Sequence, residues 1–319
     1  MPTCVQTLGI DLGGTYARAA VVDDLGTILG QAKVTLGERT PEAVVSAIAD
    51  AAQQAQRQAP GATVTHCGVG AAGQLQGSSG FILVAPNLGW RNVPFGDLLG
   101  KKLGQPVHVV NDLSAAAWGE HCAGASLGIP DVFTVFVGTG VGSAIIVNGA
   151  LVHGARGVAG ELGHVKVVVD GRQCGCGEKG CLEAYTGGHH LIAMMKDALA
   201  RGGAPRLREL VGSGEPSPAH LEQASDAGDA DAKVIYERAL DYLSLAVANQ
   251  ITVLNPGRLI LGGGVLFHTP RLRARLEKSL FTLASVSSRE GLTVASAMLG
   301  DDSGLVGAAL LARPEVRAP

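Results

Sequence analysis

Short apolar runs that end in glycine turns open the chain, and the same arrangement returns in its middle. Alternating apolar positions predict strands at both places. The expected strands are residues 7–11, 17–22 and 27–34 in the first place, and 133–137, 143–147 and 150–153 in the second. Asn148-Gly149, between the last two of these strands, is a strong hairpin signal. Two sets of strands joined by similar turns predict a duplicated fold.

Helical patterns alternate with buried strands in the rest of the chain. Thr40-Pro41-Glu42 combines a capping residue, a proline at the first helical position and an early acid, so a helix should begin there. Further helices are expected over 113–123, 189–254 with a loop at 212–218, 270–280 and 305–311, and further strands over 63–69, 107–110, 258–261 and 293–295. This alternation predicts an α/β architecture. Because 319 residues exceed a typical domain of roughly 100–200 residues, two lobes are expected.

Composition and charge narrow the class of protein. The formal net charge is −3 and no basic stripe is visible, so nucleic-acid binding has no electrostatic support. No apolar run reaches the roughly 18 residues of a transmembrane span, and the first residues lack the basic and apolar regions of a signal peptide. We therefore expect a cytoplasmic protein that has neither a membrane nor a nucleic acid as its partner.

Three cysteines, Cys174, Cys176 and Cys181, lie within eight residues, and His164 precedes them by ten. Three thiolates and one imidazole complete a tetrahedral zinc shell. Disulfide pairing is the alternative, but a cytosolic, metal-binding interpretation fits the spacing better. Four protein ligands leave no position for a catalytic water, so the zinc would be structural. The second ring nitrogen of His164 would then be available to donate to a substrate oxygen.

Glycine turns follow three of the apolar strands. They are Gly13-Gly14-Thr15, Gly138-Thr139-Gly140 and Gly262-Gly263-Gly264. Without a Cβ, the backbone N–H groups of such turns can approach phosphate oxygens closely, although any one of them could be an ordinary hairpin. Together they favour nucleotide binding, while the P-loop and the G-x-G-x-x-G fingerprint are both absent. Asp11, just before the first turn, is suited to hold Mg2+ directly or through water.

Candidate acid–base and hydroxyl-binding residues lie elsewhere. Asp112 follows a strand and opens a helix, so it could cap that helix, act as a general base in phosphoryl transfer, or do both. Asn87, in a turn after Pro86, could read a substrate hydroxyl. Glu161 and Glu183 flank the cysteine cluster, where their oxygens could accept hydrogen bonds from sugar hydroxyls. Each acid taken alone could equally be a solvated surface residue.

In order and spacing these motifs resemble the ROK family of bacterial sugar kinases, repressors and related open reading frames. The resemblance covers nearly the whole chain. It is carried by residues 11–15, 111–112, 138–142, 161–164 and 174–183. It implies an actin-like ATPase fold, which is a duplicated ribonuclease H-like fold, with two lobes, an active site in the cleft between them, and ATP with Mg2+ as phosphoryl source. We expect a small lobe over 1–112, to which a helix at 303–313 returns, and a large lobe over 113–302 that carries the zinc loop.

The resemblance also assigns roles to individual residues. By family pattern Asp112 is the catalytic base, and the cysteine cluster with His164 matches the zinc ligands. The hexose contacts would be Asn87, Asn111, Asp112, Glu161, His164 and Glu183, with Gly73 in a substrate-side loop. The nucleotide would meet Asp11, Gly13, Gly14, Thr15, Gly138, Thr139, Gly140, Gly262, Gly263 and Gly264. The loop Gly70-Ala71-Ala72-Gly73 lacks the proline that the family usually has before its last glycine.

The expected activity is the phosphorylation of the 6-hydroxyl of glucose by ATP. Kinases for N-acetylglucosamine, N-acetylmannosamine, mannose or fructose are the alternatives, because one added or inverted group is discriminated by pocket shape. A repressor core is disfavoured, since the first strand begins by Thr7 and leaves no room for a DNA-binding domain. A catalytically silent sugar-binding protein is also disfavoured, because it should lack the base or the phosphate turns, and the sequence has both. The long helix expected over 229–254 has enough apolar surface to support a homodimer.

Overall fold

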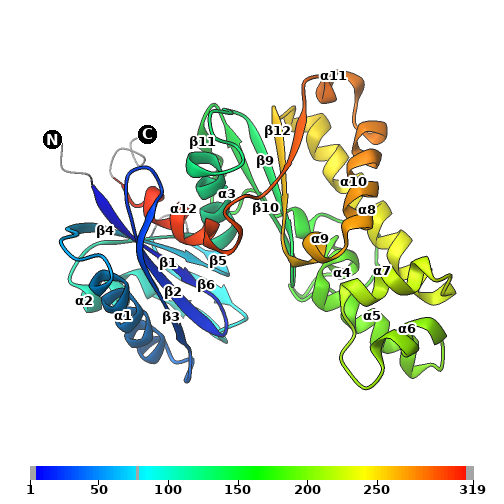
Figure 1. Cartoon of the computed structure of the whole chain (residues 1–319), viewed down its shortest axis with the longest axis horizontal. Helices are drawn as coiled ribbons and strands as arrows, with labels where there is room; N and C mark the ends of the chain where they lie inside the picture. The colour runs from blue at the N-terminus through cyan, green and yellow to red at the C-terminus, as the bar shows by residue number, and fades with distance from the viewer. Residues whose placement is uncertain (1–4, 77–78, 314–319) are drawn as a thin grey trace. The chain divides into compact units, whose positions relative to one another are not determined.

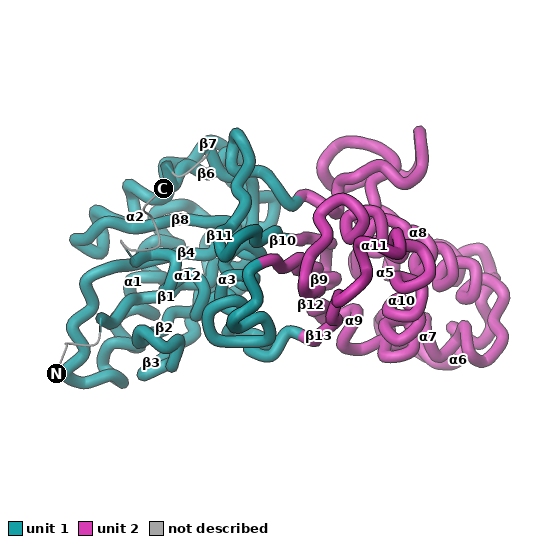
Figure 2. Tube along the Cα trace, turned by 90° about the horizontal axis from the view of Figure 1, so that it is seen from above, with its two compact units in different colours: residues 1–130, 144–160, 297–319 teal, residues 131–143, 161–296 magenta. Residues whose placement is uncertain are grey.

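The computed structural model describes residues 5–76 and 79–313, and the chain forms two compact units (Figures 1 and 2). Unit 1 takes in residues 1–130, 144–160 and 297–319, and unit 2 takes in residues 131–143 and 161–296. The bounds of these units differ from those of the lobes expected from the sequence, because residues 113–130 and 144–160 group with the N-terminal part. Residues 303–313 are also part of unit 1.

Two five-stranded sheets repeat one topology. The first has the order β3-β2-β1-β4-β8 and the second the order β11-β10-β9-β12-β13. In the first sheet β1, β4 and β8 are parallel, and β2 and β3 are antiparallel to their neighbours. In the second, β9, β12 and β13 are parallel and β11 is antiparallel to β10. This repetition confirms the predicted duplicated α/β fold.

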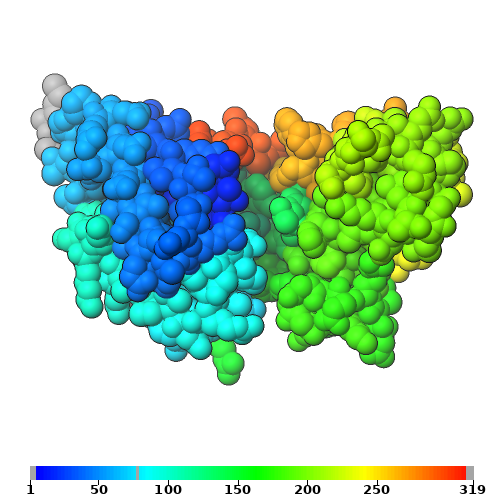
Figure 3. Space-filling view, turned by 90° about the horizontal axis from the view of Figure 1, so that it is seen from below, coloured from blue at the N-terminus to red at the C-terminus, as the bar shows by residue number. Residues whose placement is uncertain are grey.

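The observed strands lie close to the expected ones. Those of the first sheet are β1 (Gln6–Leu12), β2 (Tyr16–Val22), β3 (Ile28–Thr35), β4 (Val64–Ala71) and β8 (Val107–Asn111). Those of the second are β9 (Val132–Val137), β10 (Val141–Val147), β11 (Ala150–Leu151), β12 (Arg258–Gly262) and β13 (Thr293–Ser296). The sequence did not indicate a small third sheet of β5 (Gln74–Leu75), β6 (Ile82–Ala85) and β7 (Trp90–Val93). In the space-filling view this region is cyan and lies beside the blue N-terminal elements (Figure 3).

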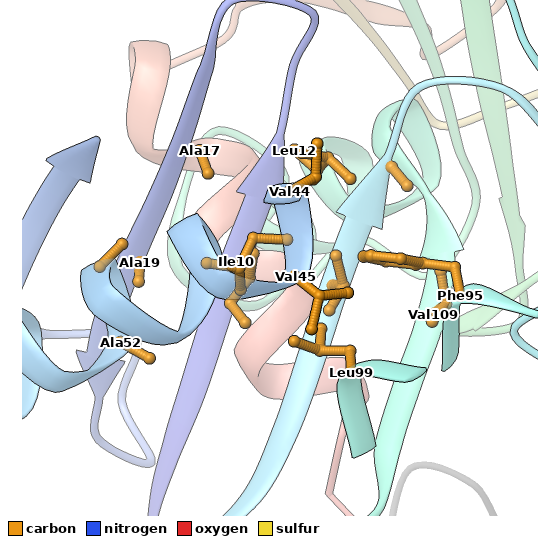
Figure 4. Close-up of a cluster of buried hydrophobic side chains, with 14 of the residues drawn as sticks. Ile10, Leu12, Ala17, Ala19, Val44, Val45, Ala52, Phe95, Leu99 and Val109 are labelled. Atoms are coloured by element: carbon orange, nitrogen blue, oxygen red, sulfur yellow. The ribbon is translucent and has the colours of Figure 1, made fainter. Parts of the chain in front are cut away.

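Helices cover both faces of the first sheet. α1 (Pro41–Arg57) and α2 (Phe95–Leu103) lie on one face, and α3 (Asp112–Ala123) and α12 (Ser303–Leu311) lie on the other (Figure 1). Strand β1 sends Ile10 and Leu12 toward α1, where they pack in a buried cluster with Val44 and Val45 (Figure 4). As predicted, Thr40 caps α1 by accepting a hydrogen bond from Ala43 N at 3.4 Å, and Pro41 is its first residue.

The second face of this sheet is closed by a very close approach of α12. A Cβ on Gly68 of β4 would lie 1.8 Å from the Ala308 carbonyl oxygen, and one on Gly307 would lie 1.7 Å from the Ala115 oxygen of α3. Only glycine permits backbones to pack at such distances. The helix is apolar all round because it is buried between the sheet and α3.

Unit 2 carries most of the remaining helices. They are α4 (Glu183–Thr186), α5 (Gly188–Ala200), α6 (Pro205–Val211), α7 (Pro218–Asp226), α8 (Ala230–Leu254), α9 (Gly264–His268), α10 (Pro270–Leu283) and α11 (Val286–Arg289). Short 3-10 turns form at Leu162–His164 in unit 2 and at Gly300–Asp302 in unit 1. Asp229 begins α8 by accepting a hydrogen bond from Ala232 N at 3.0 Å. None of the helices in the described part of the chain is long and apolar enough to cross a membrane.

Candidate active site

The carboxyl ends of the three parallel strands of unit 1 bring the N-terminal candidate residues to one edge of the sheet. Asp11 on β1 is in register with Gly70 on β4, which is in register with Val110 on β8. The Gly13–Thr15 turn, the loop that includes Gly73, and Asp112 follow these three strands. Ligands of open α/β sheets bind at this edge, where strands end and helices begin.

Asn111, rather than Asp112, caps α3. The Asn111 Oδ1 atom accepts hydrogen bonds from Leu113 N at 2.9 Å and from Ser114 N at 3.2 Å. Asn111 is the capping residue because the chain leaves β8 in an extended conformation there, and Asp112 Oδ1 also accepts a hydrogen bond from Leu113 N at 3.0 Å. Asp112 is the first residue of α3.

Asp11 and Arg18 lie opposite one another on the β1–β2 hairpin. They are register partners, and Arg18 Nη1 is 3.9 Å from Asp11 Oδ2. Arg18 also pairs with Asp302 and donates to the backbone oxygen of Asp301. Burial raises the pKa of the Asp11 carboxyl, while the Arg18 charge opposes that rise and Asp301 adds to it. A cation near Asp11 would offset the cost of burying this carboxylate.

The loop residues of unit 1 pack against the first glycine turn. A Cβ on Gly14 would lie 3.0 Å from Asn87 Cβ, so Asn87 sits directly against that turn. Asn111 Nδ2 is 3.5 Å from the Gly73 oxygen, and a Cβ on Gly73 would lie 2.5 Å from the Val84 oxygen. Gly73 has φ of 150°. The Gly73 loop thus keeps its shape through a glycine and the amide of Asn111.

In unit 2 the other two glycine turns follow neighbouring parallel strands. Gly262 at the end of β12 is in register with Phe136 near the end of β9. A Cβ on Gly263 would lie 2.5 Å from the Val137 oxygen, so these two strand ends approach closely. The Gly138-Thr139-Gly140 turn is joined to the start of α5, because Gly188 N donates to the Gly138 oxygen at 2.8 Å. The backbone N–H groups at these strand ends suit phosphate binding.

Glu183 joins the 138–142 turn to the cysteine cluster. Its Oε2 atom accepts a hydrogen bond from Val141 N at 2.9 Å, and Cys174 Sγ lies 3.7 Å from its Oε1 atom. Glu161 Oε2 is 3.8 Å from His164 Nε2. Burial raises the pKa of the Glu161 carboxyl, which the His164 charge lowers and the Glu183 charge raises further. The unit 2 candidates for sugar binding are therefore neighbours of the cysteine cluster.

The geometry of the cysteine cluster fits a tetrahedral metal site. The ligand atoms of His164, Cys174, Cys176 and Cys181 all lie within 4.8 Å of one another. The Cys176 and Cys181 sulfurs are 3.8 Å apart, as expected for a tetrahedron with metal–sulfur distances of about 2.3 Å and far too long for a disulfide. His164 Nδ1 lies 3.9 Å from Cys174 Sγ and His164 Nε2 lies 3.8 Å from Glu161 Oε2, so the two ring nitrogens face different neighbours.

The fold of the loop explains why its glycines are needed. Gly180 has φ of 76°, and a Cβ there would lie 1.8 Å from the Val168 oxygen. Tyr185 packs edge-on against Tyr242 of α8, with ring centroids 5.0 Å apart, and accepts a hydrogen bond from Arg172 N at 2.8 Å. Burial raises the pKa of the Cys174 thiol to about 12, and a coordinated metal ion would favour the thiolate.

Comparison with known proteins agrees with this geometry. The model of the ROK family matches residues 7–315. The chain belongs to the ROK family. A glucokinase from Streptomyces coelicolor is 36% identical over 313 residues, which cover 96% of this chain and 97% of that protein.

The similar proteins are named for different sugars. A ROK glucokinase from Streptomyces griseus, solved in complex with glucose and AMPPNP, shares 37% identity and a TM-score of 0.80, and the match covers 97% of this chain and 99% of that one. An N-acetylmannosamine kinase from Citrobacter koseri is 31% identical over 312 residues, which are 97% of this chain and 99% of that protein. Family membership alone therefore does not select one hexose.

Two charged residues of this ROK protein were missed by sequence reasoning. Arg18 could have been found, since the two-glycine turn fixes the hairpin register that places it opposite Asp11. Lys166 donates to the sulfur of Cys181, and nothing in its spacing from the cysteines indicates that contact. The contact between Lys166 and Cys181 depends on how the loop folds back on itself.

Proposed function

We propose that this chain is an ATP-dependent glucokinase that transfers the γ-phosphoryl group to the 6-hydroxyl of glucose. One observation carries the proposal: Asp112 opens α3 at the sheet edge where the Asp11 carboxylate and the Gly13–Thr15 turn also lie. A base and a phosphate-binding turn at one edge are what phosphoryl transfer to a hydroxyl requires. The full-length similarity to glucokinases supports glucose as the first substrate to test.

In this mechanism Asp112 accepts the proton of the attacking hydroxyl. Asn111, fixed by its capping bonds, keeps that carboxylate at the helix start. The glycine turns donate backbone N–H groups to the phosphate oxygens, and this stabilises charge that develops in the transition state. Mg2+ held near Asp11 would neutralise further charge on the phosphates. Positioning of the two reactants supplies much of the remaining rate.

The sugar-binding part of the proposal uses residues of both units. Asn87, Asn111, Asp112 and the Gly73 loop come from unit 1, and Glu161, His164 and Glu183 come from unit 2. In this proposal ATP binds at the glycine turns. Residues 138–140 and 262–264 of unit 2 contribute to the nucleotide site.

Zinc bound by His164 and the three cysteines would be structural. Its function would be to fix the loop that presents Glu161, His164 and Glu183. The closeness of the four ligand atoms, which all lie within 4.8 Å of one another, supports this assignment. Because ATP is the proposed phosphoryl donor, we propose that the enzyme works in the cytoplasm.

A coupled ADP-release assay tests the proposal. The purified protein is offered glucose, mannose, fructose, N-acetylglucosamine and N-acetylmannosamine, each with ATP or polyphosphate as donor. We expect the highest kcat/KM for glucose with ATP and Mg2+. A higher kcat/KM for an N-acetylated sugar would keep the sugar kinase and replace glucose. Absence of ADP release with every hexose would overturn the kinase.

The enzyme is also proposed to act as a homodimer. Apolar side chains remain exposed on α8 and α10 of unit 2, among them Leu245, Val253, Phe281 and Leu283. Burying such residues between two copies would be favourable by about 25 cal/mol for each Å² of apolar surface. Sedimentation velocity checks this, and a monomer at micromolar concentration contradicts it.

A further inference from the structure

An ammonium group lies against the buried edge of the cysteine cluster. Lys166 Nζ is 3.1 Å from Cys181 Sγ, and it also forms an ion pair with the Glu178 carboxylate. Cys181 is fully buried, whereas the side chain of Lys166 keeps 43% of its exposure. The lysine thus reaches from the surface to a sulfur that solvent does not touch.

Backbone pairing builds this contact. Lys166 and Cys181 form an isolated antiparallel bridge. Val167 N donates to the Gly180 oxygen at 2.9 Å, and Leu182 N donates to the Val165 oxygen at 2.9 Å. Residues that face each other in an antiparallel pair have neighbouring side chains. The approach of the ammonium to the sulfur therefore follows from how the loop is folded.

The positive charge of Lys166 lies beside a metal site that would be negatively charged. A zinc ion with three thiolates and a neutral imidazole has a net charge of about −1. Glu178 adds a second negative charge beside it, and the Lys166 ammonium lies between the two. Hydrogen bonds from charged donors are about twice as strong as those between neutral groups. Groups that contact metal ligands typically change metal affinity about 10–100-fold when they are removed.

The geometry points to Lys166 as a positioning residue of the metal site: its ammonium donates to the Cys181 thiolate, separates the anionic cluster from Glu178, and slows zinc loss. This inference rests on the zinc binding proposed above. It does not depend on the kinase activity.

Zinc release from the full-length protein tests the inference. Wild type, K166M, K166R, K179M and E178Q are loaded with zinc, and their zinc content is measured by elemental analysis. Release to an excess of a chromogenic chelator is then followed at pH 7.5. Lys179 is the matched control, because it is exposed on the same loop and K179M removes the same charge. K166R keeps a cationic donor, and E178Q keeps Lys166 without its anionic partner.

We expect K166M to release zinc about 10-fold faster than wild type, K179M to match wild type, and K166R to recover most of the difference. Equal rates for K166M and K179M would overturn the inference. If K166M does not fold, E178Q decides: faster release supports the role of the Lys166–Glu178 pair, and an unchanged rate overturns it. A wild type without zinc would overturn the metal site as well, while its kinase activity would still test the proposed reaction separately.

Discussion

Asp112 lies one position inside α3, immediately after the residue that caps the helix. Asn111 Oδ1 accepts hydrogen bonds from Leu113 N and Ser114 N, and Asp112 Oδ1 shares the first of these donors at 3.0 Å. Most of the capping falls to Asn111, and an asparagine at position 112 would keep the Oδ1 acceptor for Leu113 N. A substitution at Asp112 should therefore change the reaction much more than the fold.

The Asp112→Asn variant should lose about 10²–10⁴-fold in kcat, the usual contribution of a general base. Its amide still offers a hydrogen-bond acceptor to the sugar, so glucose binding measured by calorimetry should change little. Asp97→Asn, on the exposed side of α2, is the control for the loss of one carboxylate in unit 1. Near-normal turnover in Asp112→Asn would remove this residue from the base role.

The ionised carboxylate of Asp11 should lower the free energy of unfolding at neutral pH. Burial raises its pKa in the native state above its unfolded value, so the native protein holds this proton more tightly than the unfolded chain. The resulting loss of stability begins as pH rises through the unfolded value and is complete above the raised native value. Asp11→Asn should therefore have a higher Tm than wild type at pH 7.5, and this advantage should shrink toward pH 4. A lower Tm at pH 7.5 would contradict the inference, and kinase activity should be lost in either case.

Glycines of α12 and of the strands beneath it set how closely the elements of unit 1 pack. The sequence predicted α12 and its neighbouring strands within two residues, because apolar runs and glycine turns are local signals. It did not predict α2 or the small sheet, whose strands have only 2–4 residues. Nor did it reveal the close approach of α12 to α3, since a glycine in an apolar helix does not show what lies against it.

Gly307→Ala should destabilise the protein by about 1–3 kcal/mol, which is the usual cost of overpacking a close contact. The new Cβ would lie 1.7 Å from the Ala115 oxygen, and neither helix can move without disturbing the sheet. Gly304→Ala in the same helix is the control, since its Cβ would meet no atom closer than 3.7 Å. Urea unfolding monitored by circular dichroism measures both. Equal stability of the two variants would show that α12 can shift freely.

The zinc loop is the second element whose stability depends on more than its sequence. Removing the metal should lower Tm and raise the KM for glucose more than the KM for ATP, because Glu161 and His164 lie beside the cluster while the glycine turns keep their own backbone bonds. A tightly bound ligand present at 1,000 times its Kd stabilises by about 4 kcal/mol, so the change in Tm should be large. Adding zinc back should restore both values. Unchanged Tm and KM in protein shown to be metal-free would contradict a structural role.

At the scale of the whole molecule, the chain passes between the two units several times. Unit 1 is completed by residues 297–313, which return after all of unit 2 has been formed. The duplicated topology was readable from the repeated strands and turns. The return of the chain and the composition of each unit were not, because they depend on contacts between residues more than 150 positions apart, such as those of Glu120 with the segment before α12.

A fragment of residues 1–130 should therefore fail to fold, and the same fragment joined to residues 297–313 should fold. Without α12 one face of the first sheet exposes a large apolar surface. A chain of this size is not stable when that much apolar area stays in contact with water. A short glycine-serine linker should suffice, because buried Glu120 accepts hydrogen bonds from both Ala125 N and Met298 N and so holds the two ends near one another. Cooperative urea unfolding of the joined fragment, absent from residues 1–130 alone, is the expected result. The joined fragment with Gly307→Ala should unfold at lower urea, which shows that α12 occupies its native place. If residues 1–130 unfold cooperatively by themselves, α12 is not required to complete this unit.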